Sequence, residues 1–150
     1  MLFRSRHWIL RILIDLGGVR GIVSDGFVSE PQLLKFVGVA VENDPAQFNQ
    51  QGVIDSLRER YQDVRSKPLT WPEQTPLLKN LRWLQTQLGL SELEVGILLL
   101  CVLERHYIHL AQAMEATGTF SNFRLYSALA TLLDAPVAQV AKAKIGRAHV

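Results

Sequence analysis

The chain has 150 residues, of which 48% are hydrophobic and 20% are charged, and its formal net charge is +2. This composition favours a globular protein and excludes an intrinsically disordered chain, because enough apolar side chains are present to build a core. A single cysteine excludes a disulfide framework and favours a reducing compartment, so we expect a cytoplasmic protein.

Both ends of the chain read as foreign sequence. Residues 145–150 can be back-translated to ATC GGA AGA GCA CAC GTC, which resembles a widely used sequencing adaptor, and residues 2–5 resemble its reverse complement. We therefore expect residues 1–5 and 144–150 to be artefactual tails that lie outside the core or extend helices without burying much area. These tails hold Arg4, Lys144 and Arg147 but no acidic residue, so without them 13 of the 16 basic residues face 14 acidic ones and the formal charge becomes −1. The weak basic character that would favour nucleic acid or an anionic membrane then disappears.

Residues 6–66 are predicted to form an N-terminal helical segment. Residues 8–16 are apolar apart from Arg11 and Asp15, which indicates that residues 6–16 form a helix with a wide buried face that ends at the glycine pair 17–18. Residues 19–27 contain two more glycines and are expected to be an irregular loop, after which Pro31 begins a short helix. A clearly amphipathic helix follows. Its apolar residues recur at steps of three and four: Val53, Ile54, Leu57, Tyr61 and Val64.

The stretch 67–76 contains three prolines, which cannot continue a helix. We expect it to be a linker between the N-terminal segment and a helical subdomain over residues 77–143.

The helical subdomain begins with a leucine-rich helix over residues 77–88, which Gly89 ends. Ser91 and Glu94 have the spacing of a capping box, and the helix that follows is apolar nearly all round over residues 97–103. We expect this helix to be the core of the subdomain, with Cys101 buried as a small hydrophobic residue. The apolar run is far shorter than the roughly 20 residues of a membrane-spanning helix, so no membrane partner is expected.

No catalytic, cofactor-binding or metal-binding residue can be assigned from the sequence. His106 and His109 could share a helix face, but no other ligand stands at metal-site spacing, so packed or surface histidines are favoured. The glycines between residues 17 and 26 lack the lysine of a phosphate-binding loop. An independent enzyme is therefore the least favoured function.

Residues 128–143 read as two helices joined by a tight turn at Pro136, which resembles a helix-turn-helix. The second helix offers only Gln139 and Lys142 for a DNA groove, with Arg124 on the helix before it. An ordinary helical hairpin is favoured over a DNA reader, because no basic field is present to bind the duplex. The predicted fold is thus all-α, an irregular multi-helix bundle with a C-terminal hairpin like a helix-turn-helix.

The second half of the chain resembles the region that precedes the ATPase module in a group of bacterial AAA+ ATPases. The matching residues are Leu-Gly-Leu-Ser at 88–91 before Glu94, Ile-Leu at 97–98, Ala-Thr-Leu-Leu-Asp-Ala-Pro at 130–136 and Val-Ala-Lys-Ala at 140–143. Residues 10–18 (Leu-Arg-Ile-Leu-Ile-Asp-Leu-Gly-Gly) resemble the opening helix and glycine pair of the same family.

The resemblance implies a helical N-terminal recognition or regulatory domain, with a protein partner or substrate and a parent protein that assembles as a homo-oligomeric ring. ATP and magnesium are implied for the parent protein only, since no cofactor is expected in this chain and no family catalytic residue falls on it. The alternative function is the DNA-binding fragment of a transcriptional regulator, with nucleic acid as the partner.

Overall fold

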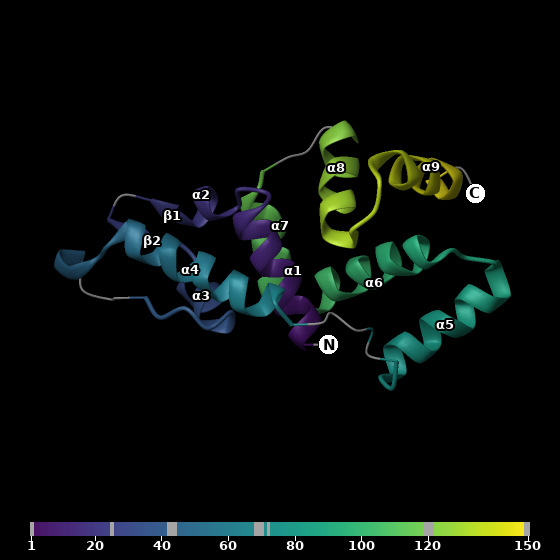
Figure 1. Cartoon of the computed structure of the whole chain (residues 1–150), viewed down its shortest axis with the longest axis horizontal. Helices are drawn as coiled ribbons and strands as arrows, with labels where there is room; N and C mark the ends of the chain where they lie inside the picture. Colours follow the sequence, from purple (N-terminus) through teal and green to yellow (C-terminus); the bar gives the residue numbers. More distant parts are fainter. Residues whose placement is uncertain are drawn as a thin grey trace. The chain divides into compact units, whose positions relative to one another are not determined.

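A computed structural model describes residues 2–24, 26–41, 45–67, 71, 73–118 and 122–148. Within these residues the fold is all-α, as predicted, and it also holds one short two-stranded antiparallel sheet that was not predicted (Figure 1). In chain order the elements are α1 (Leu2–Ile14), α2 (Val19–Ile22), β1 (Val23–Ser24), β2 (Phe27–Val28), α3 (Pro31–Phe36), the 3-10 turn η1 (Pro45–Gln47), α4 (Gln50–Arg65), α5 (Pro76–Leu88), α6 (Glu92–His106), α7 (Ile108–Ala116), α8 (Asn122–Leu133) and α9 (Val137–Ala148).

The chain divides into two compact units that do not follow the predicted domain limits. The N-terminal unit contains α1, α2, β1, β2, α3, α4 and α7, and the C-terminal unit contains α5, α6, α8 and α9. One boundary falls at residues 69–70, inside the proline-rich stretch, although Pro68 and Pro72 lie outside the described residues. The other boundaries interrupt the expected 77–143 subdomain, because α7 packs against α1 and α3 of the N-terminal unit.

The core of the N-terminal unit is the apolar surface of α1, which lies against both α4 and α7. Five α1 side chains have no exposed area: Trp8, Ile9, Leu10, Ile12 and Leu13. The predicted apolar face of α4 is confirmed for Val53, Leu57, Tyr61 and Val64, which are buried, whereas Ile54 is only half-buried. Burial of this much apolar surface is the main stabilising term of the unit.

Polar contacts fix the helices around α1. Asp15, just after α1, accepts a hydrogen bond from the Tyr61 hydroxyl of α4 at 2.5 Å. The Arg6 guanidinium donates to the Phe36 carbonyl at 3.0 Å and lies over the Phe36 ring, and Arg60 donates to the Val37 carbonyl at 3.1 Å. These bonds join α1, the end of α3 and α4, so the helix order of the unit is specified by polar as well as apolar contacts.

The expectation that residues 1–5 lie outside the core or bury little area is wrong for two of them. Arg4 is 7% exposed and Ser5 is fully buried, and both belong to the first turns of α1. A helix buried on most of its sides also buries whatever residues extend it, whether or not they are apolar. The side chains of residues 144–148 and the structure of Met1, His149 and Val150 lie outside what is described.

In the C-terminal unit, α6 contacts α5, α8 and α9. Gly89 ends α5 in the left-handed conformation (φ 65°), as its position predicted. The capping box is confirmed: Ser91 N–H donates to Glu94 Oε2 at 2.8 Å, and Glu94 N–H donates to Ser91 Oγ at 3.2 Å. Local sequence therefore sets both where α5 ends and where α6 begins.

The helix α6 is a core helix on only part of its circumference, which corrects the expectation that Cys101 is buried. Leu99, Leu100 and Leu103 are buried, but Leu98 is 37% exposed and Cys101 is exposed. The apolar composition of residues 97–103 does not reveal that Cys101 is exposed. Its exposure depends on how the neighbouring helices α5, α8 and α9 cover α6.

Replacing Leu99 with Ala should lower the free energy of unfolding by about 2–5 kcal/mol, since a fully buried leucine leaves a cavity. Replacing Leu98 with Ala should cost only about 0.5 kcal/mol, the usual cost of a surface change. Chemical denaturation followed by circular dichroism measures both values, and equal losses at the two positions would contradict the one-sided burial of α6.

The Tyr61 hydroxyl provides a second test. Burial and the hydrogen bond to Asp15 raise the pKa of Tyr61 to about 12, above its usual value of 10.0. The folded state therefore holds this proton longer than the unfolded state, so the contribution to stability is complete below pH 10 and is lost as the pH rises towards 12. In Tyr61→Phe, unfolding between pH 10 and 12 should depend less on pH than in the parent chain. Identical slopes for the two chains would refute the assignment.

Candidate functional site

The C-terminal unit contains an open groove of about 780 Å³. One wall is the turn between α5 and α6 with the first residues of α6, from Gly89 to Glu94, and the other wall is Gln139, Lys142 and Ala143 of α9. The volume is within the range of small-molecule sites. The groove is nevertheless wide open to solvent, so it would not enclose a small molecule.

An ion-pair network centred on Arg82 includes Glu92, one of the residues that line this groove. Arg82 of α5 donates from Nη2 to Glu73 Oε1 at 2.9 Å and from Nη1 to Glu92 Oε1 at 2.6 Å, and its guanidinium lies 5.6 Å from the Trp71 ring centroid. Hydrogen bonds from Gln85 and then from Arg82 lower the pKa of Glu92. The carboxylate of Glu92 thus helps to hold α5 against α6, and it shares the single positive charge of Arg82 with Glu73.

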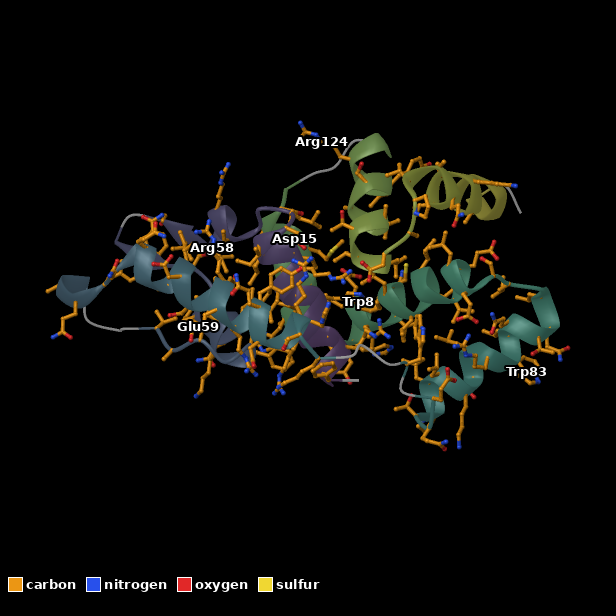
Figure 2. All side chains as sticks on the ribbon, in the orientation of Figure 1. Trp8, Asp15, Arg58, Glu59, Trp83 and Arg124 are labelled. Carbon is orange, nitrogen blue, oxygen red and sulfur yellow. The ribbon has the colours of Figure 1, made fainter. Side chains whose placement is uncertain are left out.

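The two polar residues of the helix-turn-helix hypothesis, Gln139 and Lys142, are exposed on α9. The turn between α8 and α9 is tight: Asp134 adopts a left-handed conformation (φ 52°), and the Ala135 N–H donates to the Ala130 carbonyl at 3.0 Å. Arg124 is exposed near the start of α8 (Figure 2). The hairpin therefore exists as predicted, while Gln139 and Lys142 line the groove beside the α5–α6 turn.

The two candidate histidines lie in different helices, and, as favoured from the sequence, His106 is exposed and His109 is partly packed. His106 is the last residue of α6, whereas His109 lies in α7, because the helix breaks at Tyr107. His109 packs on the Phe36 ring at 4.8 Å between centroids, and its Nδ1 lies 3.1 Å from Gln112 Oε1. Within the described part of the chain no three His, Cys, Asp or Glu side chains form a metal-binding group.

The expectation that residues 19–27 form an irregular loop is wrong. They contain α2, β1 and the first residue of β2, and Val23 of β1 pairs with Val28 of β2. A Cβ atom on Gly21 would collide with the backbone carbonyl of Ala116, so this glycine permits α2 to approach α7. The sequence shows that a glycine stands at position 21. Only the position of α7 explains why a larger residue would not fit there.

Gly21→Ala should therefore destabilise the N-terminal unit by about 1–3 kcal/mol, because the backbone of α7 would have to move. Arg20→Ala, which changes an exposed neighbour in the same short helix, is the matched control and should be almost neutral. Thermal unfolding distinguishes the two, and a neutral Gly21→Ala would contradict the close approach of α2 and α7.

Two exposed apolar side chains on α5 form the part of the surface that sequence reasoning missed. Trp83 is 62% exposed and Leu88 is 60% exposed, and Trp83 projects from α5 (Figure 2). Trp83 lies between Asn80 and Gln87 at helical spacing, on the side opposite to the buried Leu78 and Leu81. That spacing was the signal that could have identified Trp83 before the structure was known.

No protein-family model matches the chain, and neither the curated proteins nor the solved structures compared with it give a match. None of the helices in the described ranges is long and apolar enough to cross a membrane.

Proposed function

We propose that the chain is a helical recognition or regulatory domain of an AAA+ ATP-binding protein, and that its C-terminal unit contacts the protein partner. The resemblance of residues 88–98 and 130–143 to the region before AAA+ ATPase modules supports the family. The exposed Trp83 is the one observation that carries the docking role.

Trp83 has the properties of an interface anchor. Tryptophan is enriched among the residues that contribute most to protein–protein binding, because its large apolar ring gains much from burial. Here the ring stands in solvent on a helix whose other face is held in the unit by Leu78 and Leu81. A partner that covered Trp83 would bury apolar surface worth about 25 cal/mol per Å².

A DNA-binding fragment of a transcriptional regulator is the second candidate, because the α8–α9 hairpin presents Gln139 and Lys142 on an exposed side of α9. It ranks lower because the chain has 16 basic against 14 acidic residues, so electrostatic attraction to a duplex is weak.

The test is selection of binders from a library of random peptides displayed on phage, followed by affinity measurement on the purified chain. Trp83→Ala should weaken binding of the selected peptides by about 30-fold or more, the loss of about 2 kcal/mol that defines a hot spot. Phe27→Ala is the matched control, because Phe27 is an equally exposed aromatic residue in the other unit and should leave affinity unchanged.

Equal binding by the parent chain and Trp83→Ala would refute the docking role. A duplex shift at near-physiological salt that disappears in Gln139→Ala/Lys142→Ala would favour the transcriptional regulator instead. Saturable binding of magnesium-ATP to the isolated chain would contradict the proposed division of labour, since the chain has no glycine-rich loop with a phosphate-binding lysine.

A further inference from the structure

We propose that Trp71 and Glu73 form a strap that opens and closes reversibly over α6 while the C-terminal unit stays folded. The strap, defined as these two residues, lies where the chain enters that unit. It is held by Arg82 of α5 and lies against Gly96 of α6. The proposal is independent of the docking role of Trp83, because other residues hold the strap.

A single cation holds both residues of the strap. The Glu73 N–H donates a hydrogen bond to the Trp71 carbonyl at 2.9 Å, which keeps these two residues close together. The Arg82 guanidinium lies 5.6 Å from the centroid of the Trp71 ring. It also donates to the Glu73 carboxylate from Nε at 3.3 Å and from Nη2 at 2.9 Å. The strap therefore depends on one cation–π contact and one two-point ion pair, both made by Arg82.

The strap covers a position on α6 that has no side chain. Gly96 is buried, and a Cβ atom added to it would lie 3.6 Å from Cη2 of Trp71 and 3.0 Å from Cδ2 of Leu133 in α8. The Trp71 ring and the end of the Leu133 side chain thus lie where a larger residue at position 96 would extend. The absence of a Cβ atom at Gly96 leaves room on α6 for an aromatic ring that belongs to none of the helices.

The contacts that hold the strap are accessible to water. The side chain of Glu73 is 50% exposed, and Trp71 is half-buried, whereas Leu99 in the core of the same unit has no exposed area. Ion pairs this exposed contribute little, because solvent screens them and two long side chains must be ordered. Segments with few buried apolar contacts open at a lower free energy than the core beside them. The strap should therefore open before the helices unfold.

Arg82 keeps hydrogen-bond acceptors when the strap opens. Its Nη1 donates to Glu92 of α6 at 2.6 Å and to Gln85 of α5 at 3.0 Å. These bonds use a different nitrogen atom from those that reach Glu73, so release of the strap leaves the contact between α5 and α6 in place. Opening also leaves the guanidinium paired, and this avoids the cost of an unsatisfied polar group.

Quenching of tryptophan fluorescence by acrylamide measures the opening. The chain has three tryptophans, of which Trp8 has no exposed area and is shielded from the quencher. Trp83→Phe removes the exposed tryptophan, so the quenchable signal of this variant comes from Trp71. In this background Glu73→Gln should raise the ratio of open to closed strap by about two- to fivefold, the effect of losing one exposed ion pair. The quenching constant should rise with it.

Glu92→Gln in the same background is the matched control, because it removes the other carboxylate from the same arginine without changing the strap. Quenching of Trp71 should not rise in this control. Sodium chloride at about 1 M should raise quenching in the Trp83→Phe chain but not after Glu73→Gln, since salt screens the exposed ion pair that this substitution removes.

Circular dichroism shows whether the helices remain intact. The proposal is supported if Glu73→Gln increases quenching while the helical signal is unchanged. It is overturned if Glu73→Gln leaves quenching as it is, if Glu92→Gln has the same effect as Glu73→Gln, or if salt acts equally on both chains. A rise in quenching that comes with a loss of helix also overturns it, because the strap would then be part of the core.

Discussion

The helix α1 has to be covered on nearly all sides, and the arrangement of the N-terminal unit follows from that requirement. Trp8, Ile12 and Leu13 have no exposed area, and such a helix is stable in water only when neighbouring helices exclude solvent from it. The helix α4 covers one side, and α7, from far along the sequence, covers another. The chain must therefore leave the C-terminal unit after α6, contribute α7 to the N-terminal unit and then return for α8.

Close approach and polar contacts then make the packing specific. Gly21 lets α2 lie against the backbone of Ala116, and Asp15 accepts a hydrogen bond from the hydroxyl of Tyr61. Both contacts form only when the helices around α1 are arranged as they are here. The C-terminal unit uses a different solution, in which Arg82 joins α5 to the first turn of α6. Buried apolar area supplies most of the stability in both units, and these directional contacts select the geometry.

The C-terminal unit keeps one large aromatic side chain of α5 out of its core. Trp83 is 62% exposed, whereas Leu78 and Leu81 on the opposite side of the same helix are buried. This is the side chain that we propose as the anchor for a protein partner, because burial of a large apolar ring gains more than burial of a smaller side chain.

The sequence by itself determined the features that depend on residues a few positions apart. The end of α5 at Gly89, the capping box of Ser91 and Glu94, and the buried face of α4 follow from local backbone preference and helical period, and all three are as predicted. Tertiary structure decided that Ser5 is buried, that Cys101 is exposed and that α7 belongs with α1. The physical reason is that burial of a helix face depends on which other helix covers it. An apolar run such as residues 97–103 has the same sequence pattern whether neighbouring helices cover all of the helix or leave one side in solvent.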